Sequence, residues 1–315
     1  MITITRAPPY LTVQDGGRKG SRSIGVPTGG AMDTFALNAA NAIVGNDSRA
    51  AALEWALGGG AFRFDRDCVF AFAGASARAV VNGRAIAPCT TTPARAGDEV
   101  VVEQINSGRF LYVAFNGGID VPILLGSRST YLPGRFGGLA GRAMRTGDTV
   151  SVMASVTRGP VEGFHCAAEL LPRYESGIVH VVPAPQAPLF DEDAWRILTD
   201  SDYRVSSASD RTGYKLEGPS LGQSPTTLPS EPGCPGSIQI PGDGVPIVLM
   251  ADAPTVGGYA KIAVVSEADL PILAQRRPGE TVRFERITVE QSQRALKRRY
   301  SELNTIGQLA ARSQS

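Results

Sequence analysis

Short apolar runs separated by glycine and proline turns dominate the hydrophobic pattern of this chain. The runs are rich in β-branched residues, and 36 glycines and 22 prolines interrupt the sequence. This pattern predicts the following strands: Cys68 to Ala73, Ala77 to Val81, Glu99 to Glu103, Phe110 to Phe115, Val150 to Met153, Val179 to Val182, Ile238 to Ile240, Val245 to Met250, Lys261 to Val265 and Thr281 to Arg286. Many short strands between such turns favour β-barrels or sandwiches over alternating βαβ units. We therefore predict a mainly β protein.

Two kinds of turn support this prediction. Asn82-Gly83 is the residue pair that favours a type I′ turn, so it predicts a tight β-hairpin. A second pattern, Arg-x-Gly followed by an acid and a strand, occurs three times, beginning at Arg95, Arg145 and Arg277. Its glycine can adopt a positive φ, and the strand begins directly after the acid. The recurrence indicates related β modules in the two halves of the chain.

Helices are few and short in the prediction. Asp33 can cap a segment with apolar residues at helical spacing, which Gly45 ends. Further helices are predicted around Asp191 to Leu198 and over Glu267 to Gln275. The glutamine-, arginine- and leucine-rich stretch from Val289 to Ala311 predicts a terminal helix.

The order of these elements suggests a division of the chain into three parts. Residues 1–160 form an N-terminal β-rich half, residues 161–288 a C-terminal β-rich half, and residues 289–315 the terminal helix and tail. Each half is long enough to bury a core of its own.

Composition and charge narrow the possible functions. With 43% hydrophobic residues, 19% charged residues and a net charge of +1, the chain fits a soluble globular protein, with no reason to expect a nucleic-acid or membrane partner. The N-terminus lacks the pattern of a signal peptide and no apolar run is long enough to span a membrane, so we expect a cytoplasmic protein. The four cysteines are widely spaced, and we expect neither a metal site nor a disulfide framework. With only two histidines and no Gly-x-Ser-x-Gly, a Ser-His-Asp triad is poorly supported.

Polar residues gather on glycine-rich loops in the second half. Arg211 lies between Asp210 and Gly213, where a guanidinium could bind a carboxylate or phosphate in a bidentate manner. The alternative is an ion pair that only braces the loop. Asp252 follows an apolar strand, a common place for a carboxylate that orients a partner or accepts a proton. Glu231 is a second candidate acid or base.

A second group of candidates surrounds a predicted strand. Lys261 could neutralise an anionic substrate, or could be a strand-edge lysine whose charged end reaches solvent. Gly257-Gly258 could present backbone N–H groups to an oxyanion, or could be only a tight turn. Gln239 alternates with apolar neighbours, so its amide would need a partner inside a barrel. The predicted catalytic residues are Arg211, Asp252, Lys261 and Glu231, and the predicted substrate-binding residues are Ser209, Asp210, Gln239, Gly257, Gly258, Tyr259, Arg128 and Ser129.

The first half offers weaker signals. Gly29-Gly30 precedes a predicted helix and could hold an anion through free N–H groups, but no Lys-Ser/Thr follows, so it is not a P-loop. The loop from Ser127 to Tyr131 is rich in donors and could bind a carboxylate or phosphate, or only form surface hydrogen bonds. We find no ATP-binding motif and no Met-Lys-Met biotin-attachment sequence.

Several of these segments together match one family, over about Thr3 to Arg286. They are Val13-Gln14-Asp15, Gly17-Arg18, Gly25-Val26-Pro27, Gly30-Ala31-Met32-Asp33, Ala52-Leu53-Glu54, Leu57-Gly58-Gly59, Gly117-Gly118-Ile119-Asp120-Val121-Pro122, Leu125 to Tyr131, Ser209-Asp210-Arg211, Gly257-Gly258-Tyr259 and Lys261-Ile262. The chain resembles the biotin-dependent carboxyltransferase/allophanate hydrolase subunit 2-like family, and within it the stand-alone, KipA-like members.

The resemblance implies a fold and three possible functions. The fold would be two cyclophilin-like β-barrel halves with a few short helices. The first function is ATP-dependent opening of 5-oxo-L-proline to L-glutamate by a 5-oxoprolinase complex, with a KipI-like protein and a LamB/YcsF-like protein as its other subunits and with ATP used at the level of the complex. The second is carboxyl transfer to a urea-like substrate, which would require biotin on a separate carrier. The third is a regulatory protein that binds a KipI-like kinase inhibitor.

Overall fold

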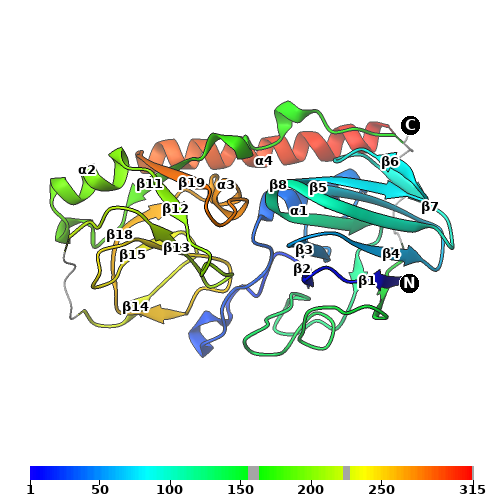
Figure 1. Cartoon of the computed structure of the whole chain (residues 1–315), viewed down its shortest axis with the longest axis horizontal. Helices are drawn as coiled ribbons and strands as arrows, with labels where there is room; N and C mark the ends of the chain where they lie inside the picture. The colour runs from blue at the N-terminus through cyan, green and yellow to red at the C-terminus, as the bar shows by residue number, and fades with distance from the viewer. Residues whose placement is uncertain (155–162, 223–227, 314–315) are drawn as a thin grey trace. The chain divides into compact units, whose positions relative to one another are not determined.

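The computed structural model describes residues 1–154, 163–222 and 228–313, and the chain forms two compact units (Figure 1). Unit 1 comprises Met1–Arg18, Gly29–Leu171 and Tyr300–Ser315, and unit 2 comprises Lys19–Thr28 and Pro172–Arg299. The boundary predicted at residue 160 lies outside the described residues, and the predicted domain limits stay predictions.

Unit 1 is built on a ten-stranded sheet. One path through the sheet has the order β2-β3-β8-β4-β1-β10-β9, and β5 joins it by pairing with β8, β6 and β7. The strands are β1 (Ile2–Arg6), β2 (Tyr10–Gln14), β3 (Ala52–Ala56), β4 (Gly60–Phe64), β5 (Cys68–Val81), β6 (Arg84–Ile86), β7 (Thr92–Ala94), β8 (Glu99–Phe115), β9 (Ile119–Asp120) and β10 (Thr149–Val152).

Two long strands organise this sheet, where the sequence predicted four short ones. β5 has 14 residues and β8 has 17, and they pair along most of their length. The first part of β8 also pairs with β4 and the last part with β3, so one strand serves both ends of the sheet. The prediction broke β5 at Gly74 and β8 before Gly108, since glycine and polar residues usually mark turns. In the structure Gly74 has a φ of 98° beside a register shift, which is a bulge within a continuous strand.

Aromatic residues fill the core of unit 1. The ring of Phe62 lies edge-on to four others, with centroids 5.5 to 6.5 Å apart: Trp55, Phe64, Phe70 and Phe115. Such edge-to-face pairs add about 0.5–1.5 kcal/mol each to the burial of the rings. Helix α1 (Thr34–Ile43) packs against β5 and β8. These contacts give the strands that carry Gln14 and Glu54 a rigid base.

Unit 2 is a closed barrel with the strand order β11-β18-β15-β16-β13-β12-β19. Its strands are β11 (Ile178–Pro183), β12 (Tyr203–Val205), β13 (Gly213–Glu217), β15 (Ser237–Ile240), β16 (Ile247–Leu249), β18 (Ala260–Val265) and β19 (Thr281–Arg286). A separate ribbon consists of β14 (Glu231–Pro232) and β17 (Val256–Gly257). The mainly β fold with two barrel-like sheets is therefore confirmed.

The predicted helices are present, with shifted ends. Asp33 caps α1 by accepting a hydrogen bond from the backbone N–H of Ala36, and Asp191 caps α2 (Glu192–Asp200) in the same way. α3 (Leu270–Ala274) is shorter than predicted, and α4 (Val289–Arg312) is the long terminal helix drawn in red and orange in Figure 1. Short 3-10 turns occur at Ser21–Ile24, Ala168–Leu170, Tyr174–Ser176 and Ala187–Leu189. In the described parts of the chain no helix is long and apolar enough to cross a membrane.

The three repeated turns have one structure. In each, the carboxylate of the acid accepts a hydrogen bond from the backbone N–H of the arginine three residues earlier, at 2.7 to 2.9 Å. The intervening glycines have φ between 86° and 92°, a range that favours glycine. Each glycine N–H also donates to a carbonyl of another strand, from Phe64, Ile4 and Val205 respectively. The predicted turn chemistry is confirmed, and the same type of turn occurs in both units.

Candidate functional site

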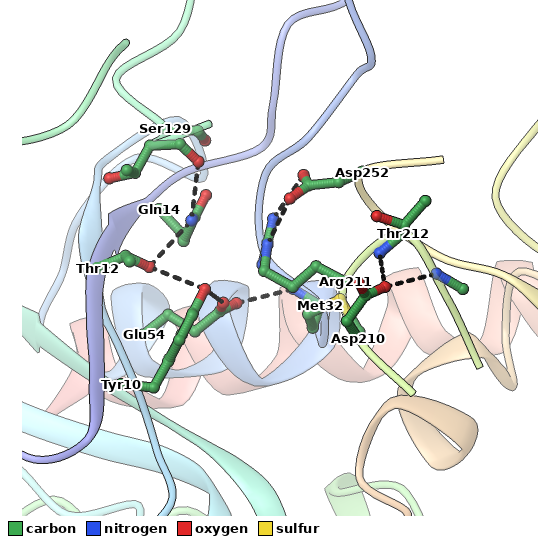
Figure 2. Close-up of polar contacts among 12 residues, drawn as sticks. Tyr10, Thr12, Gln14, Met32, Glu54, Ser129, Asp210, Arg211, Thr212 and Asp252 are labelled. Carbon is green, nitrogen blue, oxygen red and sulfur yellow. Dashed lines mark hydrogen bonds and ion pairs between the residues drawn. The ribbon is translucent and has the colours of Figure 1, made fainter. Parts of the chain in front are cut away.

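A buried ion pair of unit 2 joins Arg211 to Asp252. Nε of Arg211 donates to Oδ2 of Asp252 at 2.8 Å and Nη2 donates to Oδ1 at 3.0 Å, which is bidentate geometry (Figure 2). The side chains are only 8% and 2% exposed. Arg211 precedes β13 and Asp252 follows β16, and because these two strands pair, residues 41 positions apart meet. The backbone N–H of Asp252 also donates to the carbonyl of Arg211 at 2.8 Å.

Ser209 and Asp210 shape the loop that presents Arg211. Oδ1 of Asp210 accepts hydrogen bonds from the backbone N–H groups of Thr212 and Gly213, at 2.8 and 3.2 Å, which closes a tight Asx turn (Figure 2). The hydroxyl of Ser209 donates to the carbonyl of Lys215 at 3.0 Å. Both side chains therefore hold the backbone of their own loop.

A second charged group surrounds Lys261 at the start of β18. Its ammonium lies 3.3 Å from Oε2 of Glu231, and its side chain is 8% exposed while that of Glu231 is 46% exposed. Gln186 links the two residues: its Nε2 donates to Oε2 of Glu231 at 2.9 Å, and its Oε1 accepts from the backbone N–H of Lys261 at 2.8 Å. The sequence analysis did not single out Gln186, because it lies 75 residues from Lys261 in a loop without a motif. We call Gln186, Glu231 and Lys261 the lysine cluster.

Gln239 and Gly257 lie beside this cluster. Gln239 on β15 is the cross-strand partner of Lys261 on β18, so the two side chains share a face of the barrel wall. A Cβ on Gly257 would lie 2.8 Å from Nε2 of Gln239, so a larger residue there would require the Gln239 amide to move. Gly257 also pairs with Glu231 across the β14–β17 ribbon. Gly258 and Tyr259 follow on the surface, where Tyr259 is 53% exposed.

The two carboxylates differ in what they can do chemically. Both oxygens of Asp252 accept hydrogen bonds from a guanidinium, which makes this carboxylate a good anchor for Arg211 and leaves neither oxygen without a partner. In Glu231 both contacts fall on Oε2, and among the described residues Oε1 has no hydrogen-bond partner. Of the two, Glu231 is therefore better suited to exchange a proton with a ligand.

Arg128 and Ser129 belong to unit 1, unlike the other ten predicted site residues. They surround the buried carboxylate of Asp15, whose Oδ1 accepts from the hydroxyls of Ser127 and Ser129 at 2.6 and 2.5 Å and whose Oδ2 accepts from the backbone N–H of Arg128 at 2.6 Å. Arg128 also borders an open surface hollow of about 470 Å³ together with residues 120–123. The donor-rich loop thus binds an internal carboxylate.

A buried polar network that the sequence analysis did not predict lies nearby in unit 1. Gln14 donates to Thr12, Thr12 to Tyr10, and Tyr10 to Oε1 of Glu54, at 3.0, 3.2 and 3.0 Å (Figure 2). The hydroxyl of Tyr112 donates to Oε2 of Glu54 at 2.6 Å. Burial, reinforced by the charge of Glu54, raises the pKa of Tyr112 well above its usual value, so the phenol keeps its proton. The sequence analysis named Gln14 and Glu54 only within segments that resemble a family, and it gave neither residue a role.

This network also corrects the expectation for Gly29-Gly30. The N–H groups that follow the glycines donate within the protein: Ala31 to the carbonyl of Asp15, Met32 to Oε2 of Glu54, and Asp33 to the hydroxyl of Tyr112. The distances are 3.0, 2.9 and 2.8 Å. The protein's own carboxylate and hydroxyl therefore occupy the position that an external anion would need.

No group of three or more His, Cys, Asp or Glu side chains in the described ranges could hold a metal ion. The structure thus presents two barrel-like units, a buried Arg–Asp pair and a Lys–Glu pair braced by an amide. The chain belongs to the carboxyltransferase domain family, subdomain A and B, whose family model matches residues 24–286.

Two bacterial relatives match nearly the whole chain, and both are C-subunits of a 5-oxoprolinase. The chain is 38% identical over 313 residues to the protein from Escherichia coli strain K12, covering 99% of this chain and 98% of that protein. It is 32% identical over 294 residues to the protein from Haemophilus influenzae, covering 93% of each chain.

A larger protein contains the same fold. The crystal structure of the Kluyveromyces lactis urea amidolyase superimposes with a TM-score of 0.89 at 29% identity, covering 97% of this chain but only 20% of the amidolyase. The chain therefore corresponds to about one fifth of that protein.

Proposed function

We propose that this chain is one component of an ATP-dependent 5-oxoprolinase that opens 5-oxo-L-proline to L-glutamate. Its partners in the complex would be a KipI-like protein and a LamB/YcsF-like protein, and it would contribute little activity without them. One observation supports the proposal above all: the match to the C-subunit of a bacterial 5-oxoprolinase covers 99% of this chain and 98% of the relative.

Arg211 and Lys261 are the groups that we assign to anion binding. Opening a lactam places negative charge first on the carbonyl oxygen and finally on a new carboxylate, and fixed cations in a water-poor site stabilise such charge. Asp252 holds the guanidinium of Arg211 in one orientation, so no reorganisation is needed when charge develops. The side chain of Lys261 is 8% exposed, and burial strengthens the electrostatic interactions of its ammonium.

We assign proton transfer to Glu231. Its Oε2 is held by the ammonium of Lys261 and the amide of Gln186, which fixes the carboxylate, while Oε1 is available to a ligand. A general acid or base needs such an oriented side chain with one oxygen facing the substrate. Gln239 and the backbone of Gly257 and Gly258 would bind the polar groups of the substrate.

ATP fits the complex better than it fits this chain. The glycine pair that the sequence offers for a phosphate, Gly29-Gly30, precedes N–H groups that already donate to protein oxygens. We therefore assign ATP binding to the partner proteins and derive no step of the reaction from it here.

Carboxyl transfer is the second candidate, and the urea amidolyase structure favours it. A TM-score of 0.89 shows that this fold also occurs within a protein that acts on urea. The reaction would require biotin on a separate carrier, because this chain has no Met-Lys-Met attachment sequence. The anion-binding groups Arg211 and Lys261 would serve equally well for a carboxylated intermediate.

The test is glutamate release by the reconstituted complex. The chain is combined with its KipI-like and LamB/YcsF-like partners, and glutamate is measured with ATP and 5-oxoproline present, with each component omitted in turn. We expect release only from the complete mixture, a fall in kcat of about 10²–10⁴-fold in Glu231→Gln, and a fall of about 10²–10³-fold in Lys261→Met.

The matched control is Arg283→Ala. Arg283 forms an exposed ion pair with Asp202 at 2.7 Å in the same unit, so its loss should leave the rate within about 2-fold. If an assembled complex of wild-type proteins releases no glutamate, the proposal is wrong. Transfer of labelled carboxylate from a biotinylated carrier to urea would then be the next assay.

A further inference from the structure

An arginine from the N-terminal part of the sequence is built into unit 2. Arg22 lies in the 3-10 turn Ser21–Ile24, within the segment Lys19–Thr28 that belongs to unit 2 although the residues on both sides belong to unit 1. Nη2 of Arg22 donates to two backbone carbonyls, those of Gly233 and of Pro254, the second at 2.9 Å. These acceptors are 211 and 232 residues away along the chain.

Both carbonyls lie at one end of the β14–β17 ribbon. The ribbon pairs Glu231 with Gly257 and Pro232 with Val256, and the N–H of Gly233 then donates to the carbonyl of Thr255 at 3.2 Å. Two strands of two residues each have little stability of their own and need support from outside. The guanidinium of Arg22 bonds the segment after β14 and the segment before β17, and so joins the two chain segments at one end of the ribbon.

The ribbon and the loop before it carry the acids of the proposed site. Glu231 is the first residue of β14, and Asp252 lies two residues before Pro254. We propose that Arg22 is a positioning residue, which holds Glu231 against Lys261 and fixes the loop that carries Asp252. This inference rests on the proposed function for its effect on catalysis, but the structural part stands without it.

An arginine suits this position for a physical reason. Hydrogen bonds from a charged donor to carbonyls are stronger than those between neutral groups, and the planar guanidinium can reach acceptors on two separate chain segments from one rigid group. Arg66 makes the same kind of contact in unit 1, where its Nη2 donates to the carbonyls of Val152 and Met153, the latter at 3.0 Å. Arg66→Ala therefore removes an equivalent interaction far from the lysine cluster in sequence and serves as the matched control.

The structural part is tested by hydrogen exchange of the full chain. In Arg22→Ala we expect the peptides that cover residues 228–237 and 252–260 to exchange at least about 10-fold faster than in the wild type, because the ribbon opens more often. Arg22→Lys keeps the charge but not the planar guanidinium, so its exchange rates should lie between those of the wild type and Arg22→Ala. Unchanged exchange in Arg22→Ala, or an equal increase in these peptides in Arg66→Ala, would overturn the inference.

The catalytic part is tested in the reconstituted complex. Because Glu231 acts in the chemical step, Arg22→Ala should lower kcat by about 10–100-fold and leave KM within about 3-fold, as expected when a reacting group is displaced by about 1 Å. Arg66→Ala should leave both constants unchanged. An unchanged kcat in Arg22→Ala would refute the positioning role, whereas absence of glutamate from the wild-type complex would refute the proposed function and leave the exchange result to decide about the ribbon.

Discussion

The Arg211–Asp252 pair gives the sharpest test of the energetics in unit 2. The perturbation is a double-mutant cycle in which Asp252→Asn and Arg211→Met are made singly and together. Asp252→Asn keeps the size of the side chain and removes the negative charge beside the buried guanidinium of Arg211. Arg211→Met leaves a buried carboxylate, and the double variant contains neither charge.

The magnitude follows from the burial and the geometry. The side chains are 8% and 2% exposed and are joined by two hydrogen bonds of 2.8 and 3.0 Å. Breaking such a pair costs about 3–5 kcal/mol, because the remaining charge is buried without compensation. The double variant should cost far less than the sum of the single ones, with a coupling energy of about 2–3 kcal/mol.

Each unit contains one tryptophan, which makes the measurement selective. Trp55 lies in unit 1 and Trp195 in helix α2 of unit 2, and the chain has two tryptophans in all. In a Trp55→Phe background, fluorescence during urea unfolding therefore reports unit 2. With a denaturant dependence of about 2 kcal/mol/M, the single variants should unfold at urea concentrations about 1.5–2.5 M lower.

The exposed pair Arg283–Asp202 provides the matched cycle. Its side chains are 53% and 55% exposed, so its coupling energy should be below about 1 kcal/mol. If the Arg211–Asp252 cycle gave a coupling of less than about 0.5 kcal/mol, the pair would be as well screened as a surface pair. The assignment of Arg211 as a fixed, water-poor anion site would then be wrong.

Three further predictions concern the rest of the chain. Tyr112→Phe removes the donor to the buried carboxylate of Glu54 and the acceptor for the backbone N–H of Asp33, so it should lower the free energy of unfolding by about 2–4 kcal/mol. Tyr10→Phe should lower it by about 1 kcal/mol, and urea titrations that monitor Trp55 measure both values. The hydrogen bond from Arg142 lowers the pKa of Asp148 in the folded protein. Ionised Asp148 therefore stabilises the fold at pH values above its ordinary pKa of 3.8, and this stabilisation is lost as the pH falls through the lowered pKa. Asp148→Asn should therefore destabilise the protein by about 1 kcal/mol at neutral pH and not at about pH 2, and an equal loss at both would contradict this. In a thiol-reagent assay at mild alkaline pH, the exposed Cys234 should react quickly and the other three cysteines, whose pKa values are raised by burial, only after unfolding.

Turns and helix caps could be predicted from the sequence. Asn82 and Gly83 have φ values of 46° and 80°, as a type I′ turn requires, and they join β5 to β6 as predicted. Asp33 caps its helix through its own side chain. These features depend on residues within a few positions of one another, so the sequence carries the whole of the information. The mainly β class follows from the same local signals summed along the chain.

The continuity of the long strands could not be predicted from the sequence. Gly74 and Gly108 look like turn residues, yet both lie inside long strands, because pairing between β5 and β8 keeps the backbone extended around the bulges. Whether a glycine ends a strand or bends it depends on what the neighbouring strand offers, and that neighbour is set by the tertiary fold.

The candidate site divides in the same way. The sequence showed most of the site residues as polar positions on glycine-rich loops. It did not show which of them pair, because barrel closure brings residues together from distant positions, as with Arg211 and Asp252 or Gln186 and Lys261. Burial then decides their chemistry: Asp252 is fully engaged by a guanidinium, while Glu231 keeps one oxygen without a partner among the described residues. Sequence determined which elements form and which groups they carry. Only the tertiary structure decided which charges meet and how much water surrounds them, because both depend on long-range strand pairing that no local pattern encodes.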